Sequence, residues 1–463
     1  MFPLIHLFIM AMTVVVVLGI GIYLARGVRT ADAYSVGGRG AGCSLVAGSI
    51  AGTVVGGGAT VGTAQLAYSF GFSAWWFTLG AGIAFILMGL FYARKLRSTS
   101  LETIPEYLYL HYGPWTEFLS SIISSAGILF SAVASCLPGI ELISFFLGTE
   151  PVVSAMILAA LVMAYTFFGG MKSAGTGGIL KMGIIAISLA AAGISAWLDL
   201  SSGGILASFS SSQLSLMGRG WDASLANLVS VIVGILCTQA YVQCIFSARS
   251  PAVASVGCVA AALIVIPVGL PSVAIGMYMY ALHPVDVPMM ALPLYLFHHV
   301  PVFIGGLGMG AIVLSLIGSI GGLSLGIGTM VAKDLVAPIF HVLDDRLLLW
   351  IIRVSVALVI ALACAIAMAN RGSQILIWNY LSMSLRGAGV FVPLTMAIFL
   401  PGHLKKKWVI LSMVGSTVMA LLAVVMKTTV DPLFIGLGAS FTLLIPGISL
   451  KRLSTTPFKG DTL

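Results

Sequence analysis

Apolar runs of about 20 residues recur along almost the whole chain, and they restrict its fold more than any other feature. A helix of that length spans the hydrocarbon core of a bilayer. With 59% hydrophobic and only 8% charged residues, the chain is predicted to be an all-α polytopic membrane protein, since soluble domains carry far more charge. We predict about thirteen transmembrane helices, at 4–24, 42–68, 73–93, 117–147, 151–168, 178–198, 223–246, 255–281, 302–332, 348–369, 374–400, 408–426 and 432–450.

Lys and Arg residues are distributed unevenly between the two sides of the predicted spans. Sixteen of the 22 fall on one side and three on the other. Basic loops face the cytoplasm, so we predict a multi-pass protein of the cytoplasmic (inner) membrane. Its N-terminus is expected outside and its C-terminus in the cytoplasm, with a short cytoplasmic tail at 451–463. The three remaining basic residues lie within predicted spans: Lys181, Arg353 and Arg386.

The stretch Ser49–Tyr68 is apolar enough to span a bilayer, yet it predicts a poor helix. It holds five glycines, each costing a helix about 1 kcal/mol relative to alanine, and Thr60, Thr63 and Gln65 add polar groups. An irregular backbone is tolerated at membrane depth only where it is buried in protein or lines a cavity. Interrupted spans are also the best sequence indicator of a transporter's binding site. Close helix packing through small residues is the alternative.

Five short motifs, together with this glycine-broken second span, resemble the sodium:solute symporter family. They follow one another in the order of that family, and the hydropathy continues its pattern to about residue 450. The motifs are Tyr34–Gly42 (YSVGGRGAG), Thr99–Gly113 (TSLETIPEYLYLHYG), Phe168–Lys172 (FGGMK), Thr238–Ser250 (TQAYVQCIFSARS) and Gly318–Leu335 (GSIGGLSLGIGTMVAKDL).

The resemblance implies a LeuT-like fold, a 5+5 inverted repeat in which each repeat begins with a broken helix. The implied boundaries within a single transporter domain, 1–463, are a first span and loop at 1–41, repeats at 42–198 and 223–400, and two peripheral spans at 405–450. A solute would bind near the midplane, between the two broken helices. The residues expected to line that site are Thr60, Thr63, Gln65, Thr238, Gln239 and Tyr241.

The resemblance also implies a sodium ion, with no organic cofactor. Hard cations prefer several oxygen ligands. Aligned with the family, the carbonyl ligands fall at Gly52, Val55 and Ser315, and the usual pair of hydroxyl residues falls at Gly318 and Ser319, so one hydroxyl is missing. The expected sodium ligands are therefore Gly52, Val55, Ser315 and Ser319.

A second sodium site, which some members of the family have, cannot form here in the same way. The positions that would supply its aspartate and hydroxyl ligands are all glycines, and Lys181 replaces a glutamine. The glycines are Gly177, Gly178, Gly321 and Gly322.

Lys181 is the candidate for a coupling residue, because an ionisable group inside a span is costly and is by default a functional candidate. Its ammonium could occupy the vacated cation region, so that transport is coupled to a proton or to no ion. Alternatively, it snorkels from near the end of its span to the headgroups. Arg386 also allows two interpretations: it meets a substrate carboxylate or lines the cytoplasmic path, or it satisfies helix-end carbonyls near Pro393.

The predicted function is a secondary active transporter, a symporter that moves a small organic solute by alternating access, sodium-coupled by resemblance. A membrane sensor that has lost transport is the alternative from another class. An enzyme is not expected, because no paired carboxylates, nucleophile–base pair or phosphate loop is apparent. The six cysteines show no metal spacing or disulfide framework. The expected partners are the solute and membrane lipid, not nucleic acid, and the oligomeric state is not indicated.

Overall fold

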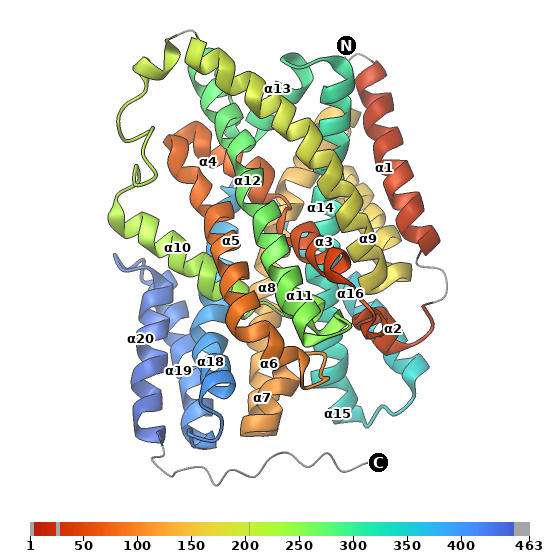
Figure 1. Ribbon diagram of the computed structural model, residues 1–463, viewed down its shortest axis with the longest axis vertical. Coiled ribbons are helices and arrows are strands. Elements are labelled where there is room, and N and C mark those ends of the chain that lie inside the picture. Colours follow the sequence, from red (N-terminus) through yellow and green to blue (C-terminus); the bar gives the residue numbers. More distant parts are fainter. Residues whose placement is uncertain (1–3, 25–27, 203, 449–463) are drawn as a thin grey trace.

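The computed structural model describes residues 4–24, 28–202 and 204–448, and these form a bundle of helices. Figure 1 shows α1 (Leu4–Leu24) at one edge of the bundle and α20 (Pro432–Leu444), with α19 (Lys406–Val425), at the opposite edge. The three helices thus lie at the periphery, and the division of the chain into two repeats and peripheral spans stays a prediction. The predicted tail at 451–463 lies outside the described residues.

The predicted first repeat contains the following helices: α3 (Cys43–Val54), α4 (Thr63–Phe70), α5 (Trp76–Leu87), α6 (Ala93–Arg97), α7 (Ile104–Tyr112), α8 (Pro114–Leu147) and α9 (Pro151–Ser202). The predicted second repeat contains α10 (Trp221–Leu236), α11 (Gln239–Ser247), α12 (Pro251–Leu282), α13 (Ala291–His298), α14 (Val302–Met330), α15 (Ala337–Phe340), α16 (Asp345–Ala369), α17 (Ile375–Arg386) and α18 (Val392–Phe399). The short helix α2 (Ala31–Ser35) precedes both.

Helices occupy all the predicted spans, although they do not all qualify as spans by length and hydropathy. Within the described residues, eight helices are long and apolar enough to cross a membrane, or nine when α10 and α11, which meet at a 45° bend, are taken as one. Shorter apolar helices include α3 and α20. The count of about thirteen therefore stays a prediction.

Gly170 divides α9 into two differently directed helices. Its backbone has φ 49° and ψ −137°, and a Cβ here would lie 2.2 Å from the carbonyl oxygen of Tyr34, so this turn requires glycine. The predicted span boundary at 178 was wrong, because the second helix already begins after Gly170. Lys181 therefore lies about 15 Å along that helix, well inside the bundle.

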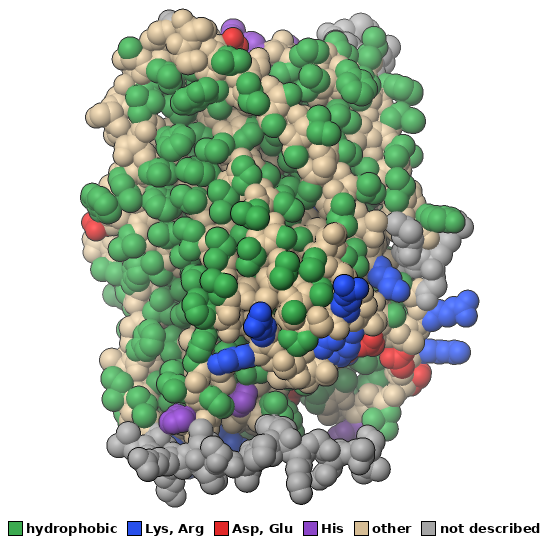
Figure 2. Space-filling model, in the orientation of Figure 1, with side chains coloured by type: hydrophobic (Ala, Val, Ile, Leu, Met, Phe, Trp, Pro, Cys, Tyr) green, Lys and Arg blue, Asp and Glu red, His purple; other side chains and the backbone are tan. Residues whose placement is uncertain are grey.

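Charged side chains gather at one end of the bundle, which we call the basic end. It contains α2, α6 and α15, and Figure 2 shows Lys and Arg in a band toward this end, with apolar side chains over much of the visible face. The predicted orientation makes this end cytoplasmic. We call the opposite end the outer end.

Candidate functional site

The first helix break lies in the middle of the glycine-rich span. Helix α3 ends at Val54, and Val55 leaves the helical conformation with φ −79° and ψ 78°. The chain then passes through Gly56 and Gly57 into a π-helical turn at Gly58–Gly62 and on into α4. A Cβ at Gly56 would lie 2.4 Å from the side chain of Ser319, so glycine lets the break pack directly against α14.

Lys181 reaches this break from α9. Its side chain is 2% exposed, and its Nζ donates to the carbonyl oxygens of Val55 and Ser315, each at 3.3 Å. The hydroxyl of Ser315 donates to the same carbonyl of Val55. The ammonium thus joins the carboxyl end of α3, where backbone carbonyls lack helical partners, to α14. Lys181 does not snorkel.

No acidic side chain pairs with this ammonium. The ion pairs of the described residues all lie at the two ends of the bundle, and none includes Lys181. On the facing helix, a Cβ at Gly318 would lie 2.7 Å from Nζ. The glycine at position 318, where the family has a hydroxyl residue, therefore leaves room for the lysine, because a larger side chain would force Nζ to move.

The expected sodium ligands are only partly brought together. Val55 and Ser315 meet at the ammonium, and Gly52 packs beside it, since a Cβ there would lie 3.5 Å from Lys181 Cε. Ser319 is turned toward α8, where its hydroxyl accepts a hydrogen bond from Ser135 at 3.4 Å. A sodium ion does not fit between the carbonyls of Val55 and Ser315 while Nζ lies within hydrogen-bond distance of both.

The second helix break holds another buried cation. Helix α10 ends at Leu236, Thr238 is extended (φ −89°, ψ 117°), and α11 begins at Gln239. From α17, Arg386 Nε donates to the carbonyl of Gly234 at 3.2 Å, and its Nη1 donates to Ser382 Oγ at 2.7 Å. Arg386 is 1% exposed. The carbonyl that it satisfies belongs to the end of α10 and not to the region of Pro393.

The surroundings of Arg386 include helices of both repeats. Ser382 Oγ also donates to the carbonyl of Gly127 on α8 and lies 2.7 Å from Ser131 Oγ. Thr238, just before α11, donates to the same carbonyl of Gly234 as Arg386 does, and the ring of Tyr241 on α11 packs edge-on against Phe85, with ring centroids 5.3 Å apart. Arg386 therefore joins α8 to the end of α10, next to the start of α11.

The hydroxyls predicted to contact the solute donate to backbone carbonyls four or five residues before them. Thr60 donates to the carbonyl of Gly56 at 2.9 Å, and Thr63 to that of Gly58 at 2.9 Å. Thr238 donates to the carbonyl of Gly234 at 2.5 Å. Thr238 shares the carbonyl of Gly234 with Arg386 at the second break, whereas Thr60 and Thr63 lie at the first break.

The two predicted glutamines connect separate elements. Gln65 Oε1 accepts the N–H of Ile375 at 3.1 Å and so joins α4 to the start of α17. Gln239 Nε2 donates to the carbonyl of Glu102, and its Oε1 accepts the N–H of Ile104, both at 2.8 Å. Gln239 thus anchors α11 to the loop before α7, at the basic end.

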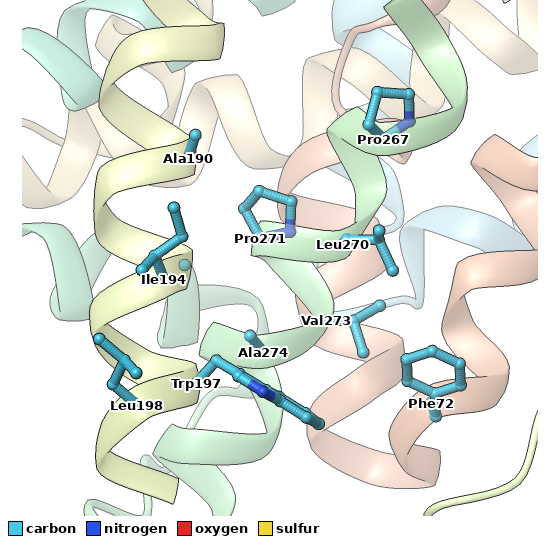
Figure 3. A pocket seen from close by; sticks show the side chains of 11 residues that line it. Phe72, Ala190, Ile194, Trp197, Leu198, Pro267, Leu270, Pro271, Val273 and Ala274 are labelled. Atoms are coloured by element: carbon cyan, nitrogen blue, oxygen red, sulfur yellow. The ribbon is translucent and has the colours of Figure 1, made fainter. Parts of the chain in front are cut away.

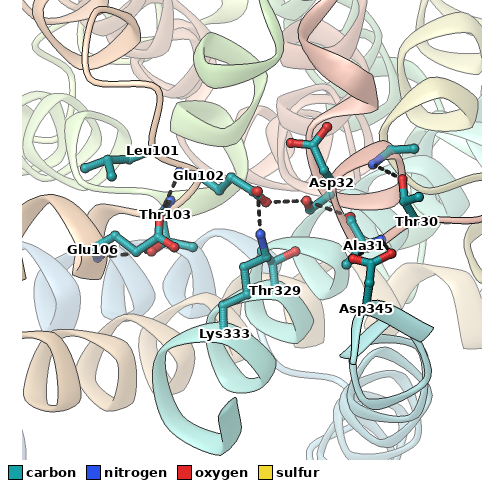
Figure 4. Close-up of polar contacts among 12 residues, drawn as sticks. Thr30, Ala31, Asp32, Leu101, Glu102, Thr103, Glu106, Thr329, Lys333 and Asp345 are labelled. Carbon is teal, nitrogen blue, oxygen red and sulfur yellow. Dashed lines mark hydrogen bonds and ion pairs between the residues drawn. The ribbon is translucent and has the colours of Figure 1, made fainter. Parts of the chain in front are cut away.

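Glu102 also belongs to a polar network at the basic end (Figure 4). Buried Glu102 forms an ion pair with Lys333 and lies 3.6 Å from Arg39 Nη2. Thr103 Oγ1 donates to Asp334 Oδ1 at 2.9 Å. These contacts connect the loop before α7 to the end of α14 and to the segment after α2, so they hold the helices together on this side.

Sequence reasoning missed a second polar group between the outer end and Arg386. Asn227 and Ser230 on α10 are buried, and Asn227 Nδ2 and Ser230 Oγ have no hydrogen-bond partner among the described residues. Asn379 on α17 packs against the first break, because a Cβ added at Gly58 would lie 2.6 Å from Asn379 Nδ2. A signal was present: 227, 230 and 234 have the same spacing as 379, 382 and 386, and each set lies on one helix face.

A cavity of about 500 Å³ between α9 and α12 is not part of this site. Figure 3 shows its apolar lining, which includes Ile194, Trp197 and Pro271. Ile194 and Trp197 are exposed on the outside of the bundle, where the apolar helices face lipid. The cavity therefore offers a place for hydrocarbon and no polar groups for a solute.

Comparisons with known proteins show which family and which solved structures the chain is similar to. The model of the sodium:solute symporter family matches residues 34–415. The high affinity choline transporter 1 of Homo sapiens is 25% identical over 392 residues, 80% of this chain and 67% of that protein. That of Mus musculus is 26% identical over 395 residues, with the same coverage.

Two solved structures share the fold. A Na+-coupled sialic acid symporter in a substrate-bound outward-open state has a TM-score of 0.83 at 16% identity, covering 96% of each chain. A transporter of the nucleobase-cation-symport-1 family in a closed conformation has a TM-score of 0.62 at 13% identity, covering 91% of this chain and 94% of the other. The LeuT-like fold predicted from the sequence is therefore confirmed.

Proposed function

This chain belongs to the sodium:solute symporter family, and we propose that it is a member in which Lys181 takes the place of the sodium ion and couples transport to a proton. The family and its solved relatives are transporters, so the chain is a secondary active transporter and not an enzyme. Relatives named as choline transporters support a small organic solute as its cargo.

One observation carries the proposal: Lys181 Nζ donates to the carbonyls of Val55 and Ser315. These are two of the oxygens that the family resemblance assigns to sodium. An ammonium supplies one positive charge and directed N–H donors to the same acceptors. It therefore does what the ion would do, which is to hold the end of α3 against α14.

The strength of this contact depends on whether Lys181 is protonated. The ammonium donates with a full charge, and charge-assisted hydrogen bonds are about twice as strong as neutral ones. When the proton leaves to water, the neutral amine loses that advantage, and α3 is held less firmly to α14. The proton enters from outside and is released to the cytoplasm with the solute, so one proton accompanies each cycle.

Few other titratable groups lie near Lys181. α14 carries none between Val302 and Met330, and α3 carries only Cys43, in its first turn. On α9, the Tyr165 hydroxyl donates to the carbonyl of Ser173 at 3.0 Å. On α8, the free thiol of Cys136 accepts a weak hydrogen bond from the thiol of Cys364 on α16. A proton-dependent change at the first break is therefore assigned to Lys181.

Thermal stability in sodium tests the proposal without knowledge of the solute. A ligand that binds only the folded state stabilises it, by about 2.7 kcal/mol at about 100 times its Kd. We expect sodium and potassium chloride at equal ionic strength to give the same midpoint. Saturable stabilisation by sodium alone would overturn the proposal. The Lys181→Ala variant removes the ammonium from the first break. Its control is Lys172→Ala, because Lys172 is an exposed lysine at the start of the same helix segment.

A further inference from the structure

We propose that Arg386 binds the carboxylate of the transported solute at the second helix break, so that the cargo is a small organic anion. This inference rests on the proposed function, because it names the solute of the same transporter. It begins from a relation between the two buried cations. Each lies on the last predicted span of its repeat and donates to a carbonyl near the end of the first half-helix of that repeat.

The two cations also face equivalent partners in the other repeat. Lys181 contacts α14, the third long helix of the second repeat, through the carbonyl of Ser315. Arg386 contacts α8, the third long helix of the first repeat, through Ser382, whose hydroxyl donates to the carbonyl of Gly127. The inverted repeat therefore places one cation at each break.

The two sites differ in how many N–H donors of the cation remain without an acceptor. An ammonium has three N–H donors and a guanidinium has five. Lys181 uses two of its donors on carbonyls. Arg386 uses Nε and one N–H of Nη1, so three of its N–H groups have no acceptor among the described residues. A planar guanidinium with spare donors fits a carboxylate in a bidentate arrangement.

Arg386 has no acidic partner among the residues that the structure describes. No acidic side chain in the described segments lies within hydrogen-bond or ion-pair distance of it. A buried charge without an opposite charge is strongly unfavourable. A solute carboxylate supplies that charge, whereas a cationic solute such as choline adds a third positive charge to the two that are already buried.

The route that we propose for the solute from the outer end to Arg386 follows polar side chains between α10 and α17. The contact of Gly234 with Met383, where a Cβ would come within 2.4 Å, fixes the face of α10 that meets α17. Asn227 and Ser230 lie seven and four residues before Gly234, on that same face, and both are buried with an unpartnered polar atom. These atoms are available to a polar solute that passes between α10 and α17.

A basic side chain lies at the outer end of this route. Arg219 lies just before α10, with its guanidinium over the ring of Phe70 at 5.0 Å, and Asp222 follows in the first turn of α10. Arg219 Nη1 and Tyr380 Oη have no hydrogen-bond partner in the described structure. A cation at the entrance of a route raises the local concentration of anions. The guanidinium of Arg219 therefore offers a carboxylate a first contact before Arg386.

The test measures thermal stability of the purified full-length chain with matched pairs of probes. The probes are aliphatic, aromatic and hydroxy monocarboxylates, each paired with its neutral amide, together with choline chloride. We expect saturable stabilisation by at least one carboxylate and none by its amide or by choline. In Arg386→Gln the apparent Kd is expected to rise at least about 30-fold, which corresponds to about 2 kcal/mol.

Three further variants keep the result interpretable. Arg386→Lys retains the charge and is expected to keep the preference for carboxylate over amide at lower affinity. Arg353→Gln removes another arginine within a helix, one that lies over the rings of Tyr34, Phe167 and Trp350, and is expected to bind as the wild type does. Lys181→Met is also expected to retain carboxylate binding.

Two results overturn the inference: no stabilisation by any carboxylate, or stabilisation that is unchanged in Arg386→Gln. A preference for choline overturns it equally. None of these results bears on sodium, so this inference fails separately from the proposed role of Lys181. Conversely, sodium-specific stabilisation with intact, Arg386-dependent carboxylate binding overturns only the role of Lys181.

Discussion

The two helix breaks hold a buried cation in equivalent places, yet the chemistry of the two cations is different. At the first break, a compact ammonium lies between two backbone carbonyls, and the glycine at position 318 leaves room for it. At the second, a planar guanidinium uses only part of its donors. The comparison teaches that equivalent positions of an inverted repeat can hold cations with different numbers of spare donors. The two roles that we propose, replacement of an ion at the first break and binding of a carboxylate at the second, follow from that difference.

The largest expected effect distinguishes the second break, with Arg386, from the first break, with Lys181. Removing the guanidinium in Arg386→Gln should weaken carboxylate binding by about 2–5 kcal/mol, the range for truncating one partner of a buried charged pair. Isothermal titration with the best carboxylate checks this. Equal losses in Arg386→Gln and Lys181→Met would erase the distinction between the two sites.

The driving force for uptake should depend on the first break alone. In proteoliposomes, a pH gradient is expected to drive wild-type uptake of that carboxylate, and Lys181→Met is expected to lose at least about tenfold in rate, or about 1.4 kcal/mol. Binding of the carboxylate should persist, because Lys181 does not contact it. Uptake that follows a sodium gradient in the wild type contradicts the account of Lys181.

Adding a methyl group at each break sharpens the comparison further. In Gly318→Ala the new Cβ meets Lys181 Nζ, whereas in Gly127→Ala it meets Arg386 Cβ and the backbone of Ser382, both at 3.1 Å. The first variant should act through a flexible side chain, so its effect should shrink in a Lys181→Ala background, with a coupling of about 0.5–3 kcal/mol. Gly127→Ala should have the same effect with or without the arginine side chain.

The smallest expected effect concerns the route to Arg386. Asn227→Ala removes an amide whose Nδ2 has no partner among the described residues, so the stability should change by about 0.5 kcal/mol or less. Carboxylate association should slow a few-fold, because the route loses a polar contact. Stopped-flow binding measures this, and an unchanged rate argues that the solute enters elsewhere.

The sequence predicted the fold and the two breaks because clustered glycines and polar residues disfavour a continuous helix in an apolar span. It misplaced the start of the second part of α9, since the glycines and serine between 171 and 178 are typical of a loop. In the structure they are helical because small residues allow close approach to α3: a Cβ at Gly178 would lie 2.1 Å from the carbonyl of Gly48. Small residues serve this role widely in membrane helix packing.

The candidate site was less predictable, because hydrogen-bond partners depend on the tertiary structure. Thr60 and Thr63 remain predicted solute contacts, and the structure adds that their hydroxyls donate to the carbonyls of Gly56 and Gly58. Ser319 faces α8 and not the ammonium. The sequence identified Lys181 as unusual, although its depth and its two carbonyl partners became visible only once α3, α9 and α14 were packed together.

Equilibrium binding of radioactive sodium to the purified protein tests the central claim most directly. Wild-type protein is expected to bind no sodium at the first break. The double variant Lys181→Ala/Gly318→Ser, which removes the ammonium and restores the missing hydroxyl beside the carbonyls of Val55 and Ser315, is expected to gain saturable binding. Saturable sodium binding by the wild type, lost when Ser315 is replaced by alanine, would contradict the claim that Lys181 has taken the place of the ion.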